Sequence, residues 1–517
     1  MPFSTPLRNK RRKVQFKPSM ASQPTSTQTP SARLQEILTS ERIQELSESE
    51  EFEDMDTEPA EALTPQLAKF HLVQSPLRDE LETETSDAQD QTVEDILPFL
   101  TENPYEFDLN SHGIPTLQRS RHISFLHHAL GSYPARMAAM DAARPWILYW
   151  SLQGLTCLGE DVSKYQERKI FNLALIYKSS VTYTLSPCQN PTGGFGGGHG
   201  QLSHLAVSYA AVLSLVMVGG KEAYEMIDRK AMWHWLGNVK QRDGGFTMAS
   251  GGEEDIRGAF CAMVIIALLN LPLELPPESP ARIKGDETFL TNLPEWVARC
   301  QTYEGGMSDS PGDEAHGAYA FCALGCLCIV GAPYDTMTKY LDIPALLAWL
   351  TARQTSPEGG FTGRTNKLVD GCYSHWVGGC WALLEAALLG PRKTASLPKE
   401  RLWDREALAR YILCCCQGPN GGLRDKPWKQ PDAYHTCYNL AGLSAVQHRY
   451  VYDSEKESEF EASPLSAAFK WAVAEDMEEK NEVWDETDKV ELIHPVFVVP
   501  LGKAEAIRRY FEEKVGF

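Results

Sequence analysis

The stretch QTYEGGMSDSPGDEAHGAYAFCALGCLCIV, residues 301–330, contains a pattern that recurs along the chain and indicates its fold class. A glutamine precedes the pair Gly305-Gly306, a large apolar residue follows it, and about ten residues later a long segment of small and apolar residues begins. The pattern recurs at steps of 51, 61, 54 and 62 residues, with further pairs at Gly193-Gly194, Gly244-Gly245, Gly359-Gly360 and Gly421-Gly422. A period of this size is typical of repeat architectures.

Each repeat is predicted to be a pair of helices joined by a glycine-rich turn. Residues 120–452 show no alternating apolar pattern, and their apolar runs are too long for strands. Five such units, and a less obvious one over 145–158, leave two arrangements, an open solenoid and a closed α/α barrel. The inner helix of each unit is apolar almost all round, as expected of a helix buried on both sides. The sequence therefore predicts an all-α protein, a closed α/α barrel (toroid) of about six helical-hairpin repeats with Gly-Gly turns.

The acidic residues are concentrated in one part of the chain. The chain carries 49 Lys+Arg and 69 Asp+Glu, a net charge of −20, and residues 41–95 alone hold 18 acidic and 3 basic residues, a net of −15. Residues 1–95 are also rich in Ser, Thr, Pro and Gln, a composition that cannot bury enough apolar surface to order the chain. We expect a disordered acidic tail over 1–95, the barrel domain over 96–517, and an acidic insertion over 453–489 within that domain.

The composition also argues against several classes of protein. The net negative charge disfavours nucleic acid as the main ligand. The apolar run that contains Cys261 to Leu269 is far shorter than the roughly 20 residues that a membrane span needs. The N-terminus has no apolar segment of the kind found in secretory signals. Thirteen cysteines, three of them consecutive at 414–416, do not look like a disulfide framework. We therefore expect a cytosolic or nuclear protein without a membrane span, and of these two locations we favour the cytoplasm.

The starts of the predicted inner helices carry different polar residues at equivalent positions. Aligned on their first acidic residue, they read DIRGAF from Asp255, EAHGAY from Glu314, DGCYSHW from Asp370 and DAYHTCY from Asp432. The third residues of these segments are Arg257, His316, Cys372 and Tyr434, and His435 follows the last of them. A packing position would recur as one residue type, whereas a site assembled from several units shows this variety. The alternative is that each residue only caps or orients its own helix.

Three residues near these helix starts have the donor atoms of a zinc site. Asp370, Cys372 and His435 offer one oxygen, one sulfur and one nitrogen, a set that suits Zn²⁺ and leaves its fourth position open. Asp370 and His435 belong to neighbouring inner-helix starts, so a closed barrel would bring them together. The alternative for Cys372 is a small buried side chain, like the other cysteines of this region.

Cationic and aromatic side chains accompany this group. Arg364 and Lys367 lie six and three residues before Asp370, and they join Arg257 and His316 at the same mouth of the barrel. A diphosphate suits such a cluster near helix N-termini. The aromatic residues nearby are Trp146, Trp150, Tyr319, Tyr373, Trp376, Tyr434 and Tyr438. A barrel lined with aromatics and rimmed by cations fits a long hydrocarbon with a charged head. The alternatives are a solvated cationic face and ordinary core packing.

Three blocks of the sequence resemble the β subunits of protein farnesyltransferases, in the protein prenyltransferase β family. They are NKLVDGCYSHW over 366–376, KPWKQPDAYHTCY over 426–438 and HPVFVVPLGKAEAIRRYF over 494–511, and the Gln–Gly-Gly repeats extend the similarity over about 120–452. The resemblance implies a catalytic β subunit that transfers a farnesyl group from farnesyl diphosphate to the cysteine thiol of C-terminal C-a-a-X motifs through a zinc-bound thiolate. It further implies a farnesyltransferase α subunit as heterodimer partner, and C-a-a-X proteins such as small GTPases as substrates.

The resemblance also implies roles residue by residue. It places one Zn²⁺ on Asp370, Cys372 and His435, and Mg²⁺ on the diphosphate near Asp425. The residues implied for catalysis are His316, Arg364, Lys367, Tyr373 and Asp425. Those implied for farnesyl diphosphate are Arg257, His316, Gly317, Ala318, Tyr319, Arg364, Lys367, Tyr373, Trp376 and Tyr438. Those implied for the peptide are Trp146, Trp150, His204, Ala206 and Tyr434. Two positions depart from the family pattern, Phe260 where Tyr is common and His375 where an apolar aromatic is usual.

Three other functions stay open at this point. A geranylgeranyltransferase type I β subunit would share the fold and the zinc, but the bulk of Trp146 and Tyr438 favours a shorter prenyl chain. A non-catalytic helical-repeat binding scaffold would explain the repeat but not the ordered Asp-x-Cys and His set. A terpene cyclase is disfavoured because the sequence lacks the aspartate-rich motifs DDxxD and DxDD.

Overall fold

The computed structural model describes residues 82–131, 140–165, 181–390, 402–456, 460, 465–474, 483–514 and 517. The chain divides into two units, Met1–Ala62 and Leu63–Phe517, and every described residue belongs to the second. The tail expected to be disordered covers residues 1–95, and residues 1–81 of it lie outside the described part of the chain. None of the described helices is long and apolar enough to cross a membrane.

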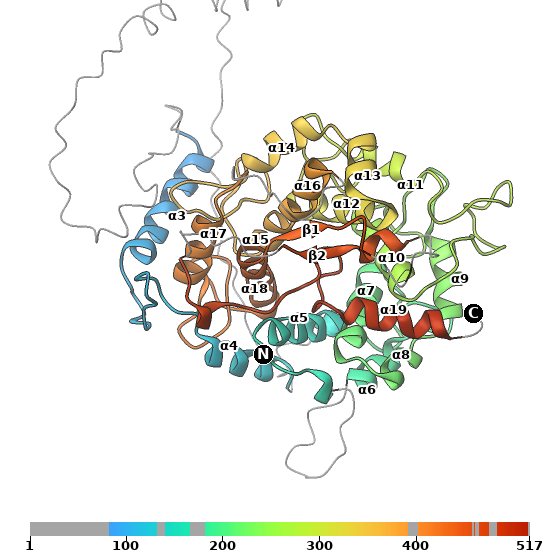
Figure 1. The fold of residues 1–517 in the computed structure, drawn as a ribbon, viewed down its shortest axis with the longest axis horizontal. Helices are drawn as coiled ribbons and strands as arrows, with labels where there is room; N and C mark the ends of the chain where they lie inside the picture. Colours follow the sequence, from blue (N-terminus) through green and yellow to red (C-terminus); the bar gives the residue numbers. More distant parts are fainter. Residues whose placement is uncertain are drawn as a thin grey trace, which may run out of the picture. The chain divides into compact units, whose positions relative to one another are not determined.

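The inner ring of the second unit is a closed circle of helices (Figure 1). In the described part of the chain its members are α5 (Arg144–Cys157), α7 (Leu205–Val218), α10 (Ile256–Leu268), α12 (Gly317–Val330), α16 (Gly378–Leu389) and α18 (Ala433–Gln447). Each contacts the next, and α18 packs on α5 to close the ring. Every residue of α12 from Ala320 to Ile329 is buried, since the helix has neighbours on all sides. The closed α/α toroid predicted from the sequence is confirmed.

Shorter helices lie outside this ring. They are α4 (Arg119–Ala129), α6 (Val181–Leu185), α8 (Lys221–Glu225), α9 (Arg229–Val239), α11 (Leu293–Arg299), α13 (Pro333–Tyr340), α14 (Ile343–Thr351) and α17 (Arg405–Arg410). The last continues as the π-helix η6 (Tyr411–Cys416), and short 3₁₀ turns cover Ser163–Tyr165, Ser186–Cys188 and Glu486–Asp488. Asp228, Asp342 and Asp404 cap α9, α14 and α17 by accepting a backbone N–H of the first turn.

The glycine pairs are required by the close approach of the next outer helix. Gly305 has φ +96°, and a Cβ there would lie 2.2 Å from the carbonyl oxygen of Ala345 in α14. A Cβ on Gly306 would lie 2.5 Å from the indole of Trp349 in the same helix. The first position therefore needs both the left-handed backbone and the absence of a side chain. The other pairs lie in the same way against α9, α11, α17 with η6, and α4.

The glutamine before most of the glycine pairs bonds to the start of the next outer helix. Gln301 Oε1 accepts a 2.8 Å hydrogen bond from the backbone N–H of Asp342, the N-cap of α14. The same bond joins Gln189 to Asp228 and Gln354 to Asp404. Gln417 accepts a 2.8 Å bond from the N–H of Gln118 before α4, so the last repeat is tied to the first. The recurring motif therefore stabilises contacts between repeats.

The C-terminal segment covers one end of the barrel (Figure 1). It comprises the antiparallel pair β1 (Tyr450–Tyr452) and β2 (Trp471–Val473), the 3₁₀ turn Ser466–Phe469 and α19 (Lys503–Glu513). Arg508 donates to the carbonyl of Ala267 at the end of α10, and Ser444 near the end of α18 donates to the carbonyl of Glu491. This segment covers the C-terminal ends of inner helices, and Trp471, within the predicted insertion 453–489, belongs to the core. The opposite end, where the inner helices begin, is called the mouth below.

The predicted tail boundary at residue 95 falls inside a helix, α3 (Glu84–Thr101). Thr83 caps it, and its buried apolar side chains include Val93, Ile96 and Leu100. These residues recur at helical spacing, so one stripe of an otherwise acidic segment finds a partner surface. The described structure therefore begins well before the predicted boundary, because local composition hid this stripe.

Candidate functional site

The proposed zinc ligands come together at the mouth. The ligand atoms of Asp370, Cys372 and His435 all lie within 4.8 Å of one another. Cys372 is the N-cap of α15 (Tyr373–Trp376), and His435 lies in the first turn of α18. Oxygen, sulfur and nitrogen donors at this separation fit a metal ion, and the set is consistent with zinc. The closed ring brings together two segments that are more than sixty residues apart in sequence.

Hydrogen bonds orient these ligands. His435 Nε2 lies 3.3 Å from Asp370 Oδ1, while Nδ1 of the same ring lies 2.7 Å from Asp432 Oδ2. Burial lowers the pKa of His435, but its bonds to Asp370 and Asp432 outweigh burial and raise that pKa to about 10. Burial and the Asp370 carboxylate raise the pKa of the Cys372 thiol. A ligating imidazole whose second nitrogen meets a carboxylate is a common arrangement in metal sites.

His316 and Tyr373 form a second group at the mouth. His316 is the N-cap of α12, and its Nδ1 accepts the N–H of Ala318 at 3.1 Å. Burial, with the charges of Arg364 and Arg257, lowers the pKa of His316 to about 4, so the ring is neutral at pH 7. Its proton is therefore on Nε2, which lies 3.1 Å from the Tyr373 hydroxyl and donates to it. The Tyr373 proton is thereby left for another acceptor.

The loop with Arg364 and Lys367 is attached to the start of α12. The N–H of Gly317 donates to the carbonyl of Gly363 at 2.8 Å, and a Cβ on Gly363 would lie 2.0 Å from the Tyr373 ring. Arg364 pairs with Glu314 at 2.6 Å. Within the described residues, the exposed Lys367 ammonium has neither an ion pair nor a side-chain hydrogen bond. At least one cation is thus available to an anion at this rim.

Arg257 lies on the neighbouring helix start. Asp255, the buried N-cap of α10, accepts a hydrogen bond from the backbone N–H of Arg257 and forms an ion pair with the Arg257 guanidinium. The guanidinium carbon lies 5.4 Å from the centre of the Tyr319 ring, a cation–π contact. Asp255 and Asp432 therefore do cap their own helices, as the alternative interpretation held, while they also orient a side chain at the mouth.

The backbone of Asp425 is hydrogen-bonded to the segment that carries two of the candidate metal ligands. Its carbonyl accepts the N–H of Gly371, between two of the candidate ligands, at 2.7 Å. Its carboxylate pairs with the Lys426 ammonium at 2.6 Å, and burial together with Asp370 raises the pKa of Asp425. Sequence analysis did not single out Lys426. The sequence signal that could have identified Lys426 is its position directly after Asp425.

A wall of aromatic rings adjoins these groups. Tyr434 lies 5.4 Å from Trp150 and 4.9 Å from Tyr438, and Tyr438 lies 4.5 Å from Trp376, measured between ring centres. The Trp376 indole N–H donates to the Tyr434 hydroxyl at 3.1 Å. Trp146 stacks on Trp150 at 5.4 Å and 26°. The predicted aromatic residues of α5, α15 and α18 therefore lie in contact with one another in the structure.

The remaining predicted residues and the two departures lie near this wall. His204 is the N-cap position of α7, and Ala206 lies in its first turn. Phe260 lies 5.8 Å from Tyr209 and 5.7 Å from Phe321. His375 is buried and stacks on Tyr438 at 5.3 Å and 24°, and burial lowers its pKa to about 3. A neutral imidazole thus takes an aromatic position in the wall.

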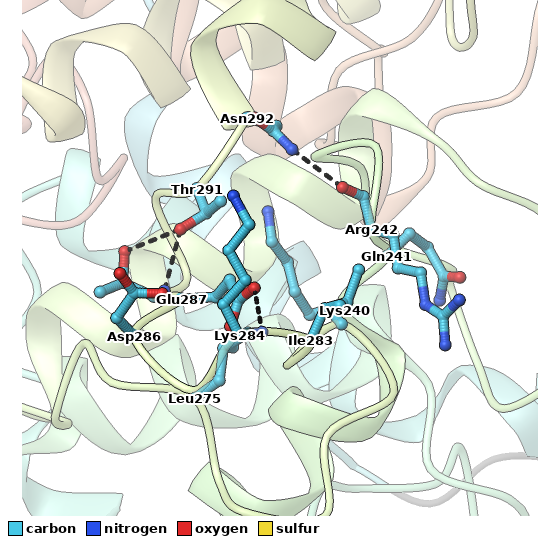
Figure 2. Close-up of a pocket in the computed structure, with 12 residues that line it drawn as sticks. Lys240, Gln241, Arg242, Leu275, Ile283, Lys284, Asp286, Glu287, Thr291 and Asn292 are labelled. Atoms are coloured by element: carbon cyan, nitrogen blue, oxygen red, sulfur yellow. Dashed lines mark hydrogen bonds between the residues drawn. The ribbon is translucent and has the colours of Figure 1, made fainter.

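A separate cavity of about 350 Å³ includes none of the predicted site residues (Figure 2). It is lined by Lys240, Gln241, Arg242, Leu275, Ala281, Ile283, Lys284, Asp286, Glu287, Thr288, Thr291 and Asn292. Burial lowers the pKa of Lys240 to about 7, and its ammonium donates to the Gly244 carbonyl at 2.6 Å. Gln301 makes the corresponding bond to Gly305 in the next repeat. Lys240 therefore stabilises a glycine turn.

Comparison with known proteins agrees with this geometry. A family model described as the prenyltransferase alpha-alpha toroid domain matches residues 117–499. A protein farnesyltransferase subunit beta from Pyricularia oryzae is 49% identical over 451 residues, which cover 86% of this chain and 83% of the relative. The chain belongs to the protein farnesyltransferase β-subunit family. The corresponding subunit of Schizosaccharomyces pombe is 35% identical over 433 residues, covering 84% of this chain and 98% of the relative.

Two further comparisons concern geranylgeranyl transferases. The type-1 subunit beta of Arabidopsis thaliana is 27% identical over 352 residues, covering 64% of this chain and 86% of the relative. A solved structure described as Candida albicans protein geranylgeranyltransferase-I complexed with GGPP has a TM-score of 0.54 and 20% identity, covering 78% of this chain and all of the other. That structure supports the fold alone. The predicted farnesyltransferase family and enzyme class are confirmed by the more similar relatives.

Proposed function

We propose that this farnesyltransferase β subunit transfers a farnesyl group from farnesyl diphosphate to the cysteine thiol of C-terminal C-a-a-X sequences. The observation that carries the proposal is the group of Asp370, Cys372 and His435 within 4.8 Å, beside cations and an aromatic wall. The 49% identity with a farnesyltransferase β subunit over most of the chain supports it.

The cationic rim is proposed to bind the diphosphate. Arg257, Arg364 and Lys367 present cationic donors from two repeats, His316 orients the Tyr373 hydroxyl beside them, and the N-termini of α10 and α12 lie alongside. Charge develops on the leaving diphosphate as its bond to C1 of the prenyl group breaks, so donors placed here stabilise the transition state. Tyr373 donates its proton in the same direction because its oxygen already accepts from His316.

The aromatic wall is proposed to hold the hydrocarbon and the end of the peptide. Trp376, Tyr438 and Tyr319 would line the prenyl chain, together with the starts of α12 at Gly317 and Ala318. Trp150, His204, Ala206, Tyr434 and Trp146 would face the C-terminal residues of the peptide. Trp146 would also limit the length of the prenyl chain, because its indole fills space beside Trp150 and Tyr209.

Two metals are included in the proposal. Asp370, Cys372 and His435 would hold Zn²⁺, and Asp425 would meet Mg²⁺ on the diphosphate. When bound, zinc keeps a peptide thiol ionised near neutral pH, and magnesium neutralises part of the diphosphate charge. Asp432 keeps the His435 ring oriented, and Lys426 is a counter-charge for Asp425 within the site.

The partner is proposed to be a farnesyltransferase α subunit, and the substrates to be C-a-a-X proteins such as small GTPases. The cytoplasmic location inferred from sequence stays a prediction. Coexpression with an α subunit tests the partnership: the proposal expects transfer only by the heterodimer. Full activity of the β chain alone, as a monomer, would contradict an obligate partner.

The transfer reaction itself is tested with matched peptides and diphosphates. The heterodimer is incubated with farnesyl or geranylgeranyl diphosphate and with a C-a-a-X peptide or its Cys→Ser counterpart, and products are identified by mass spectrometry. We expect farnesyl addition to the cysteine peptide alone, with a higher kcat/KM for farnesyl than for geranylgeranyl diphosphate. A preference for geranylgeranyl diphosphate would point to the type I geranylgeranyltransferase instead.

A further inference from the structure

Trp428 combines two unusual features on the loop that follows Asp425. Its φ is +66°, a left-handed conformation that a bulky residue adopts only under constraint. Its side chain is 63% exposed, so little burial compensates for the backbone strain. Strained residues persist where their surroundings fix them and often accompany functional sites. The conformation of Trp428 is therefore expected to be held by the residues that contact it.

The ring that meets Trp428 belongs to α3, ahead of the matched toroid domain. Phe99 in α3 is buried and lies edge-on to Trp428, with 5.3 Å between ring centres and 75° between planes. Arg424, four residues before Trp428, contacts the faces of both Phe99 and Tyr105, its guanidinium carbon 5.4 and 5.3 Å from the two ring centres. Arg424 also donates to the Tyr105 hydroxyl at 2.9 Å and to the Cys415 carbonyl at 3.1 Å. Residues 99–105 thus contact both ends of the segment 424–428.

The same segment is bonded to the centre of the site. The carbonyl of Arg424 accepts from Asn439 of α18 at 3.1 Å. The carbonyl of Asp425 accepts from Gly371, between the candidate ligands Asp370 and Cys372. Lys426 then pairs with the Asp425 carboxylate and is only 12% exposed. A displacement of this segment would therefore move a carboxylate and an ammonium at the mouth.

We propose that Phe99 of α3 is a positioning residue: through its contact with Trp428 it fixes the loop that presents Asp425 and Lys426 to the diphosphate. The inference rests on the proposed function, in which these groups face the diphosphate. Phe99 does not touch substrate in this scheme. It acts by restricting Trp428 and, through the turn in which the N–H of Lys429 bonds to the carbonyl of Lys426, by restricting Lys426.

Two variants and a control test the inference on the heterodimer. Phe99→Ala removes the ring that contacts Trp428. Trp428→Gly removes the same contact from the other side, and glycine adopts the left-handed backbone conformation of position 428 without strain. Gln89→Ala is the matched control, because it breaks the bond between the other end of α3 and Glu358. Inorganic pyrophosphate and farnesyl diphosphate are the probes, measured by titration, with the peptide KM and the zinc content as further readouts.

We expect Phe99→Ala and Trp428→Gly to weaken the binding of both diphosphates by roughly tenfold, in line with the effect of small misplacements of binding groups. Peptide KM, zinc content and the Gln89→Ala control should remain at wild-type values. In a Lys426→Ala background, Phe99→Ala should have almost no additional effect, because the two residues act through one loop.

The contrary results separate this inference from the proposed function. A lower thermal midpoint with unchanged pyrophosphate affinity in both variants would show that α3 only stabilises the fold. Fully additive effects of Phe99→Ala and Lys426→Ala would also overturn the positioning role. Tight pyrophosphate binding that depends on Phe99, with no farnesyl transfer by the wild-type protein, would contradict the proposed function alone.

Discussion

Nε2 of His316 lies 3.1 Å from the hydroxyl oxygen of Tyr373, and the other nitrogen of the same ring accepts the N–H of Ala318. These two bonds define the tautomer, since a neutral ring that accepts at Nδ1 carries its proton at Nε2. Tyr373 then accepts from His316, so that its own proton is left for another acceptor. A helix N-cap thereby sets the direction of a donor on another repeat.

Tyr373→Phe tests this arrangement. The change removes one donor from the proposed leaving-group site and leaves the ring beside Gly363. We expect kcat to fall by roughly a hundredfold, the usual effect of losing one donor to developing charge. The affinity for farnesyl diphosphate should change much less. Single-turnover rates and titrations measure the two quantities, and Tyr450→Phe, on the covered end of the barrel, is the control. Wild-type rates for Tyr373→Phe would remove the hydroxyl from the mechanism.

His375→Phe is expected to reduce the acid sensitivity of the fold. Burial lowers the pKa of His375 to about 3, below its unfolded value of about 6.5. As pH falls, the unfolded chain binds the proton first, so this contribution to stability is complete above about pH 6.5 and declines toward pH 3. Between pH 7.5 and 5.5 the histidine should account for about 1.4 kcal/mol of lost stability.

Denaturant unfolding of wild type and His375→Phe at the two pH values measures this difference. Phe is expected to fit the site, because the imidazole stacks on Tyr438 and its Nε2 has no hydrogen-bond partner in the described structure. An identical pH dependence in both proteins would mean that His375 is already protonated or solvated in the folded state.

Removing residues 1–81 should leave catalysis unchanged. The deletion stops before Thr83, which caps α3, so the contact of Phe99 with Trp428 is kept. We expect kcat/KM within about threefold of wild type. A fall of more than about tenfold, roughly 1.4 kcal/mol of transition-state stabilisation, would mean that the deleted segment reaches the site. A deletion through residue 101 should instead weaken diphosphate binding, because it removes α3.

The sequence predicts the repeat and the metal group well because both depend on local residue identity. The glycine pairs and apolar inner helices follow from spacing, and the order Asp370, Cys372, His435 follows from the register of the repeats. The contribution of α3 was missed because its apolar stripe is diluted by acidic neighbours and its partners, among them η6 and Trp428, lie more than 300 residues away in the sequence. Lys426 was missed for a similar reason, since the role of a single lysine becomes visible only once the structure places it beside the partly buried Asp425.

Trp146→Thr tests the limit on prenyl length. The indole stacks on Trp150 and contacts Tyr209, so its removal opens apolar space that a fourth isoprene unit can fill. Each Å² of apolar surface recovered there contributes about 25 cal/mol. We expect the ratio of kcat/KM for farnesyl over geranylgeranyl diphosphate to fall by roughly tenfold or more. A less stable but zinc-loaded variant with an unchanged ratio would assign Trp146 to core packing alone.

The zinc content of wild type and Cys372→Ala shows whether Asp370, Cys372 and His435 hold zinc. We expect one zinc per β chain in the purified wild-type heterodimer by inductively coupled plasma analysis. We expect little zinc and no turnover in Cys372→Ala, with the affinity for farnesyl diphosphate largely retained because the proposed diphosphate donors, Arg364 and Lys367, are unchanged. Cys380→Ala, at another buried cysteine, should keep its zinc. Full zinc in Cys372→Ala, or equal loss of zinc and diphosphate binding, would exclude Cys372 as a zinc ligand.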